Sequence, residues 1–144
     1  MSAIPDSPTG TGMSRAAGAT HALLRIFAAL IFICPGGMKL FGWFGGMPKG
    51  VALTPLLATA GVIEVVGGTL LLLGLFTRPV AFITSGEMAV AYFKGHFPHG
   101  FWPILNQGQP AVLLCFIFLF LAAAGPGPFS LDYLRGHRRA TARS

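Results

Sequence analysis

Charged side chains lie inside apolar segments of this chain. Burying a charge in such a segment is unfavourable, so a charged residue there usually forms an ion pair or serves a function. Glu64 stands near the centre of residues 53–76, a segment with no other charged residue. A charge at the centre of a bilayer costs about 2.5–3.5 kcal/mol on insertion scales, so such groups usually pair with another polar group or handle protons and ligands. Glu87 lies within a later apolar segment, and Arg25 and Lys39 lie near the two ends of the first one. Ligand binding is the chemistry that these residues suggest, with the two glutamates as candidate catalytic groups; a purely structural ion pair is the alternative.

The expected depths of these charges suggest which of them pair. Arg25 and Lys39 are fourteen residues apart, a separation that returns a helix to nearly the same face. Arg25 would lie near one membrane surface and Lys39 near the other. Glu64 would lie at mid-bilayer, and Glu87 somewhat nearer to the Arg25 side. Depth therefore predicts the pairs Arg25–Glu87 and Lys39–Glu64. The opposite assignment stays open, as does the alternative that both basic side chains reach the lipid headgroups.

Cysteine and histidine residues offer two further kinds of chemistry. Cys34 and Cys115 fall at similar depths, so a redox pair is feasible if their helices are neighbours; small core residues are the alternative. His96 and His99 flank Pro98 at the end of an apolar segment. The sequence around them shows no third ligand of the usual kind, and proline disrupts the helical spacing. An interfacial loop is therefore favoured there, and we expect no metal site.

The composition is that of a membrane protein. Of the 144 residues, 53% are hydrophobic and only 10% are charged, whereas soluble domains have about 25% charged residues. The net charge of +6 comes from bases that flank apolar segments, where they act as topology signals. The expected partner is therefore the lipid bilayer and not nucleic acid. The sequence carries no motif for a dinucleotide, a haem or an iron–sulfur cluster, so no cofactor is evident from the residues.

Four apolar segments are long enough, or nearly so, to cross a bilayer as helices. They are residues 22–41, 53–76, 80–97 and 110–124. Stretches rich in glycine and proline follow the first and third segments, and the tight break Thr77-Arg78-Pro79 follows the second. The sequence therefore predicts an all-α protein, a four-helix transmembrane bundle, within residues 21–134. We expect residues 1–20 to be a disordered tail and residues 135–144 to be a basic cytoplasmic tail.

Basic and aromatic residues indicate how this bundle sits in the membrane. With four spans, seven arginines fall on the side of both termini and three lysines on the other side. The positive-inside rule then places both termini in the cytoplasm. Trp43 and Trp102 lie at the segment ends on the lysine side. They fit an aromatic belt, and a platform on which a quinone stacks is the alternative.

Several motifs follow one another in an informative order. They are Arg25, Gly37-Met38-Lys39-Leu40, Ile63-Glu64-Val65-Val66-Gly67-Gly68, Leu73-Gly74-Leu75-Phe76-Thr77-Arg78, Glu87-Met88-Ala89-Val90-Ala91-Tyr92-Phe93, Phe97-Pro98-His99-Gly100-Phe101-Trp102-Pro103 and Gly125-Pro126-Gly127-Pro128-Phe129-Ser130-Leu131-Asp132. In that order they resemble the DoxX family of small four-helix bacterial membrane proteins, over about residues 22–134. One motif departs from the family pattern, because Asn106-Gln107-Gly108-Gln109 stands where many relatives have Asn-Gly-Gly-Glu. Any function that the carboxylate at this position has in those relatives therefore cannot be assigned to Gln109.

The resemblance implies a multi-pass protein of the bacterial inner membrane. It further implies a membrane component of a redox or thiol and oxidative-stress system, with a quinone or quinol as ligand and an oxidoreductase subunit as partner. Whether the chain is itself an enzyme stays open, and so does a homo-oligomer. Arg25, Lys39, Glu64 and Glu87 would bind the ligand, and the two glutamates would handle protons. A small transporter and a non-catalytic scaffold for a partner enzyme are the alternatives.

Overall fold

The chain folds into helices joined by short connections. The computed structural model describes residues 10–135, which contain no β-strand. The α-helices are α1 (Gly10–Phe41), α2 (Pro55–Leu73), α3 (Thr77–Ala91) and α4 (Gln109–Ala124). A 3-10 turn, η1 (Trp43–Gly45), follows α1; a π-helical turn, η2 (Tyr92–His96), and a 3-10 turn, η3 (Phe97–His99), follow α3. The prediction of an all-α protein is confirmed for the described residues.

Helix α1 is longer than the sequence predicted. It begins at Gly10, so residues 10–20, which we expected to be disordered, are helical. Alanine has the highest helix propensity, and the alanines that precede the apolar segment extend the helix toward the N-terminus. The helix also continues through Pro35. Residues 1–9 and 136–144, which include most of the predicted basic tail, lie outside the described residues.

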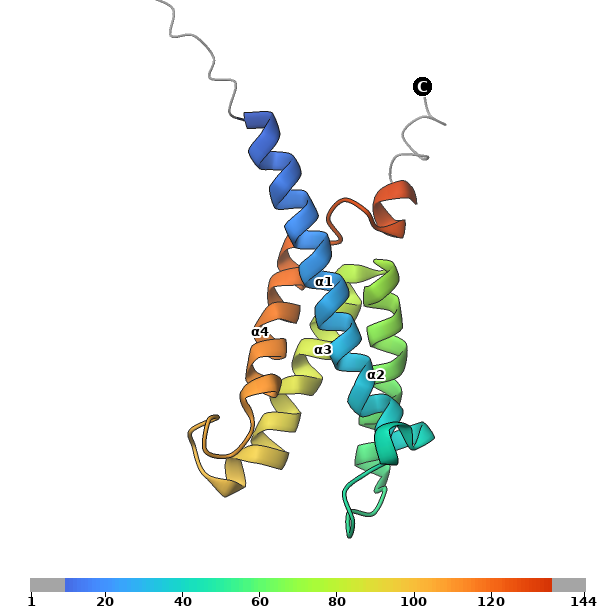
Figure 1. Cartoon of the computed structure of the whole chain (residues 1–144), viewed down its shortest axis with the longest axis vertical. Coiled ribbons are helices and arrows are strands. Elements are labelled where there is room, and N and C mark those ends of the chain that lie inside the picture. Colours follow the sequence, from blue (N-terminus) through green and yellow to red (C-terminus); the bar gives the residue numbers. More distant parts are fainter. Residues whose placement is uncertain (1–9, 136–144) are drawn as a thin grey trace, which may run out of the picture.

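The helices form two pairs. Helix α1 packs along α2, and α3 packs along α4. The pairs approach each other chiefly through α2 and α3, and they diverge toward the end that carries the α1–α2 and α3–α4 connections (Figure 1). We call this the open end. The described chain begins and ends at the opposite end, the closed end, where the pairs converge (Figure 1).

Small residues let the helices converge. An ideal Cβ atom at Gly68 would lie 2.5 Å from Cγ1 of Ile33 on α1, and one at Gly67 would lie 2.8 Å from Cγ2 of Thr84 on α3. Adjacent glycines of α2 therefore allow close packing against both neighbouring helices, as is common among membrane helices.

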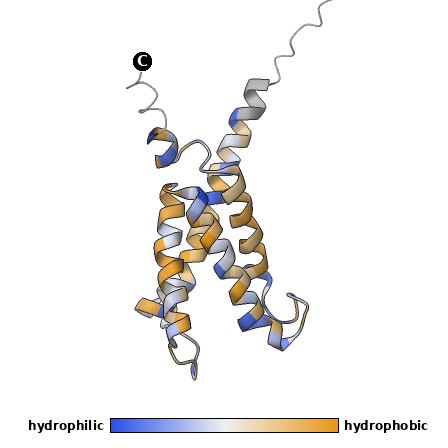
Figure 2. Cartoon of the chain, turned by 180° about the vertical axis from the view of Figure 1, so that it is seen from behind, coloured by the Kyte–Doolittle hydropathy of each residue, from blue (hydrophilic) through white to orange (hydrophobic). Residues whose placement is uncertain are grey.

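The outer surface is apolar. Hydrophobic residues make up most of the helices (Figure 2), and Phe27, Phe82 and Phe116 are each at least 60% exposed. By length and composition, residues 15–41 of α1 and the whole of α2 are able to cross a membrane, whereas α3 and α4 are shorter, with 15 and 16 residues. An apolar surface of this extent suits a lipid environment.

Candidate ligand site between α2 and α3

An ion pair between α1 and α2 lies beside the candidate site. The Nζ atom of Lys39 donates to both carboxylate oxygens of Glu64, at 2.5 and 2.6 Å. The side chain of Glu64 is 2% exposed and that of Lys39 is 16% exposed. The predicted pairing of Lys39 with Glu64 is confirmed, and Glu64 faces the interior as expected.

Glycines bring α1 and α2 close enough for this ion pair. A Cβ atom at Gly36 would lie 2.8 Å from Cβ of Glu64 and 2.9 Å from the carbonyl oxygen of Gly61. A Cβ atom at Gly61 would in turn lie 3.3 Å from Cβ of Lys39. Because neither glycine position has room for a side chain, the two backbones approach closely. The stems of both charged side chains are held at this crossing.

A cavity lies beside the ion pair. Its volume is about 520 Å³, within the range of about 300–1,000 Å³ that is usual for small-molecule sites. Lys39 reaches its wall from α1 and Glu87 reaches it from α3, whereas Glu64, which was also expected to bind the ligand, does not line the cavity. Apolar side chains of α2 and α3 form much of the remaining wall, and they include Leu56, Leu57, Ala60, Ile63, Ile83 and Val90. The cavity is therefore mostly apolar, with a few polar groups at defined positions.

Glu87 contributes an unsatisfied acceptor to this site. Its Oε2 atom is buried and has no hydrogen-bond partner. Glu87 interacts electrostatically with both Glu64 and Lys39, but the ammonium group of Lys39 is bound to Glu64. A buried acceptor without a donor costs about 1–3 kcal/mol. A hydroxyl group of a ligand in the cavity would satisfy it.

A narrower groove continues from the cavity between α2 and α3. It has a volume of about 200 Å³ and is lined almost entirely by apolar residues. Ile63 and Ile83 line both the cavity and the groove, so the two spaces adjoin. The groove runs along Val66 and Leu70 of α2 and Val80 of α3, toward the closed end. It suits the hydrocarbon tail of a molecule whose polar head lies in the cavity.

Arg25 lies at the closed end and does not line the cavity. Its guanidinium group donates to the carbonyl oxygens of Leu71 at 2.8 Å, Leu72 at 3.2 Å and Phe129 at 2.8 Å. The predicted pair Arg25–Glu87 is therefore wrong. The last carbonyls of a helix carry the negative end of its dipole, so the end of α2 attracts a buried guanidinium, and the carboxylate of Asp132 interacts electrostatically with the same group.

Two further residues stabilise helix ends there. The carboxylate of Asp132 accepts hydrogen bonds from the backbone amides of Phe76 and Thr77, at 3.0 and 2.9 Å, and so caps α3. Arg78 donates to carbonyl oxygens at the end of α4. The sequence analysis missed both roles, treating Arg78 only as a topology signal. The ordered occurrence of Asp132 in the family motif was the one available signal, because local spacing does not link partners so far apart in the chain.

The remaining candidate residues have separate positions. His96 lines the cavity, whereas His99 does not, and the described residues contain no group of three His, Cys, Asp or Glu side chains suited to a metal ion. Cys34 and Cys115 are both free. They belong to different helix pairs, and the sulfur of Cys115 lies 3.6 Å from the hydroxyl of Ser85. These contacts fit small packing residues.

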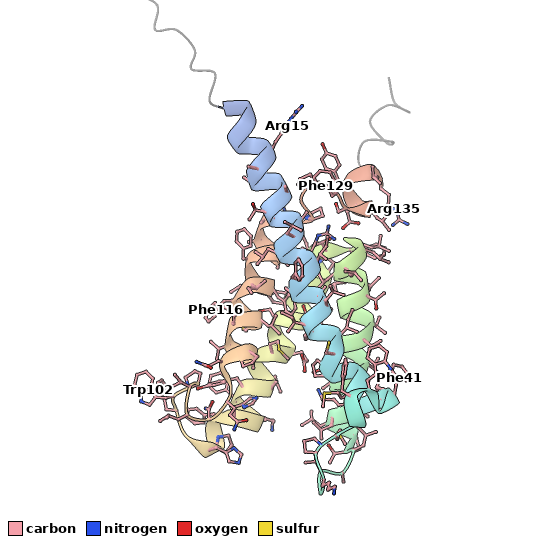
Figure 3. All side chains as sticks on the ribbon, in the orientation of Figure 1. Arg15, Phe41, Trp102, Phe116, Phe129 and Arg135 are labelled. Carbon is pink, nitrogen blue, oxygen red and sulfur yellow. The ribbon has the colours of Figure 1, made fainter. Side chains whose placement is uncertain are left out.

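The two tryptophans lie at the open end but not on the cavity wall. The Trp43 ring packs against Gly37, where a Cβ atom would lie 2.0 Å from it. Trp102 is 63% exposed and projects outward from the α3–α4 connection (Figure 3). These positions suit an aromatic belt rather than a platform for a ligand in the cavity.

An apolar exterior, membrane-length helices and a charged site among them define an integral membrane protein. The DoxX family model matches residues 20–97, a range that includes every residue lining the cavity. The chain belongs to the DoxX family. Among solved structures, none matches it.

Three relatives cover most of the chain. An uncharacterized protein of Haemophilus influenzae is 45% identical over 116 residues, which are 77% of this chain and 87% of that protein. The inner membrane protein YphA of Escherichia coli is 33% identical over 127 residues, covering 76% of this chain and 86% of that protein. An uncharacterized membrane protein of Mycobacterium tuberculosis is 30% identical over 138 residues, covering 83% and 82% of the two chains.

Proposed function

We propose that this protein is a membrane component of a redox or oxidative-stress system and binds a quinone-like lipophilic molecule between α2 and α3. The observation that carries the proposal is the buried, unpartnered Oε2 atom of Glu87 on the wall of a largely apolar cavity. The DoxX family resemblance implies the redox setting. The largely apolar wall of the cavity, with a few polar groups, supports a lipophilic ligand that has a polar head.

The shape of the site supports a molecule with a polar head and an apolar tail. The cavity of about 520 Å³ has room for a substituted ring, and the adjoining groove of about 200 Å³ takes part of a hydrocarbon chain. Such a ligand would bury its apolar surface on both α2 and α3. Burial is favourable by about 25 cal/mol for each Å² of apolar surface removed from water, although a ligand arriving from lipid gains less.

The polar groups support head-group recognition and proton exchange. An ammonium group has three donors, so Lys39 retains one for a ligand carbonyl while it binds both oxygens of Glu64. Glu87 offers an acceptor for a ligand hydroxyl. Reduction of a quinone to a hydroquinone takes up two electrons and two protons. In this proposal the glutamates exchange the protons, and a partner oxidoreductase subunit exchanges the electrons.

Binding is favoured over transport by the continuity of α1. Transporter sites are typically formed by discontinuous helices near the bilayer midplane. The sequence Pro35-Gly36-Gly37 could have supplied such a break, but α1 runs through it without interruption. At the closed end, Arg25 joins α1 to the end of α2 and to Phe129. These contacts favour a site that opens at one end only.

The proposed location is the bacterial inner membrane, with four spans and both termini in the cytoplasm. The name of the relative YphA describes an inner membrane protein. Arg15 and Arg135 lie at the closed end (Figure 3), the end from which the described chain starts and to which it returns. A cluster of arginines on one side is the usual mark of the cytoplasmic face.

The proposal is tested by ligand capture and by blocking the cavity. The full-length protein is purified in mild detergent, and co-purifying quinones are identified by mass spectrometry. The affinity for a short-chain benzoquinone is then measured by titration calorimetry. We expect the Gly86→Phe variant to lose binding, because Gly86 lines the cavity and no atom stands within 4 Å of its ideal Cβ position.

The matched control is Ala123→Phe, which adds the same side chain at an exposed position of α4 outside the cavity. We expect this variant to bind as the unaltered protein does. Absence of quinone from the purified protein together with no measurable binding would overturn the proposal. So would equal binding by the Gly86→Phe variant.

A further inference from the structure

His96 lies on the cavity wall because of an irregular turn. His96 lies nine positions after Glu87, and nine positions of α-helix make about 2.5 turns, which would place the two residues on opposite faces. The chain instead forms the π-helical turn η2 over Tyr92–His96, where the amide of Phe97 donates to the carbonyl of Tyr92, five residues back. Both Glu87 and His96 line the same cavity as a result. Such π-helical turns are frequent at functional sites.

The hydrogen bond of His96 fixes which ring nitrogen is free. Its Nδ1 atom lies 3.0 Å from the backbone carbonyl oxygen of Asn106. A carbonyl oxygen can only accept, so Nδ1 carries the hydrogen in the neutral imidazole, and Nε2 presents a lone pair.

The partner of His96 is itself held in place. The side chain of Asn106 is buried; its Nδ2 atom donates to the carbonyl of Gly100 at 2.6 Å, and its Oδ1 atom accepts from the amide of Gly108 at 2.8 Å. The hydroxyl of Tyr92 donates to the carbonyl of Phe101. These contacts tie η2 to the α3–α4 connection and hold the imidazole ring against the cavity.

We propose that His96 is a ligand-binding residue whose Nε2 atom accepts a hydrogen bond from a hydroxyl group of the molecule in the cavity. The inference rests on the proposed function and narrows its ligand class. Glu87 Oε2 is an unpartnered acceptor on the same wall, so the site offers acceptors at two places along α3 and η2. A hydroquinone, which carries hydroxyl donors, is therefore bound more tightly than a molecule of similar shape without donors.

The test compares two probes on the purified full-length protein. One probe is a short-chain alkyl hydroquinone kept reduced, and the other is its dimethyl ether, which has the same ring but no hydroxyl donor. We expect the unaltered protein to bind the hydroquinone about tenfold more tightly, which corresponds to about 1.4 kcal/mol, because the ether has no donor for the acceptors of Glu87 and His96.

Substitutions at His96 separate ligand contact from structural contact. Asparagine places its amide near the position of Nδ1, so His96→Asn can keep the bond to Asn106 while it removes the acceptor at Nε2. We expect this variant to keep the thermal midpoint of the unaltered protein and to lose part of its preference for the hydroquinone, because the acceptor of Glu87 remains. Glutamine places its carbonyl oxygen near the position of Nε2, so His96→Gln should retain the preference. His99→Asn, outside the cavity, is the matched control and should leave both affinities unchanged.

Nitrogen NMR of the unaltered protein supplies a measurement that does not depend on any variant folding. The Nε2 resonance of His96 should shift when the hydroquinone saturates the site and should not shift with the dimethyl ether. An unshifted resonance at saturation, or full hydroquinone preference in a folded His96→Asn variant, would overturn the role of His96. Failure of the unaltered protein to bind either probe would instead overturn the proposed function and this inference with it.

Discussion

The Lys39–Glu64 ion pair is the residue-scale feature on which the candidate site depends. Removing one partner of a buried pair leaves an uncompensated charge and typically costs about 3–5 kcal/mol, whereas replacing both partners by apolar or neutral groups is often close to neutral. We predict that Glu64→Gln lowers the thermal midpoint in detergent strongly. Combining it with Lys39→Met should restore most of the loss.

The double variant also separates structure from function. If the pair serves only to join α1 and α2, the Glu64→Gln and Lys39→Met protein should recover both stability and quinone binding. We expect it to recover stability alone, because Lys39 lines the cavity. A double variant as unstable as the single one would show that Lys39 does not compensate Glu64.

Depth in the membrane predicted one of these pairs and failed for the other. Glu87 was expected to lie nearer to the Arg25 side, so Glu64 was matched with Lys39. Arg25 was assigned to Glu87 because the sequence shows only side-chain charges. The carbonyl groups that Arg25 binds at Leu71, Leu72 and Phe129 are of a kind present in every residue, and only the fold reveals which of them lie within reach of the guanidinium group.

At the scale of helices and their connections, Asp132 controls the start of α3. It accepts hydrogen bonds from the amides of Phe76 and Thr77, which would otherwise have no intrahelical acceptor. We predict that Asp132→Ala lowers stability by about 1–2 kcal/mol, the usual cost of losing an N-cap. Asp132→Asn keeps a capping oxygen and should lose clearly less. Thermal unfolding measures both effects, and faster hydrogen exchange at Thr77 would locate them.

The close crossing of α1 and α2 leads to a second prediction, which concerns the stability of glycine variants. A Cβ atom at Gly36 would meet the backbone oxygen of Gly61 at 2.9 Å, and a backbone atom cannot move aside cheaply. Gly36→Ala should therefore push the helices apart and destabilise the protein by about 1–3 kcal/mol. Gly86→Ala adds the same methyl group where no atom stands within 4 Å, and it should be neutral or stabilising. Equal stability of the two variants would contradict the close crossing.

Helix positions were more accessible to sequence analysis than irregular turns. Residues 110–124 were predicted as a span, and α4 covers Gln109–Ala124. The third segment was predicted to run from residue 80 to residue 97 as one helix, but α3 ends at Ala91 and η2 follows. Hydrophobic periodicity detects that a segment is helical, and it has no signature for one widened turn. The position of His96 in the cavity was missed for that reason.

The whole molecule is closed at one end and hollow toward the other. Its closed end is held together by hydrogen bonds of Arg25 and Asp132 to backbone groups far away in the sequence. Toward the open end, the cavity separates α2 from α3. The sequence predicted Lys39, Glu64 and Glu87 as candidate ligand-binding residues. It could not predict the cavity, because the cavity depends on the angle between the helix pairs, which the sequence does not give. We expect hydrogen exchange to be slower at the closed end than at the open end.

The difference between the closed end and the open end also predicts how the protein is oriented in the membrane. The described chain starts and finishes at the closed end (Figure 1), and the arginines there oppose the lysines of the open end, Lys49 and Lys94 among them. Because positively charged residues are retained in the cytoplasm, we predict that a reporter fused after Ser144 is cytoplasmic. Reporters fused in the α1–α2 connection near Gly46, or in the α3–α4 connection near Gly100, should both be periplasmic. A reporter near Gly46 on the same side of the membrane as one after Ser144 would contradict the four-span arrangement. The helices α2, α3 and α4 lie between these two positions, and three crossings place the two reporters on opposite sides.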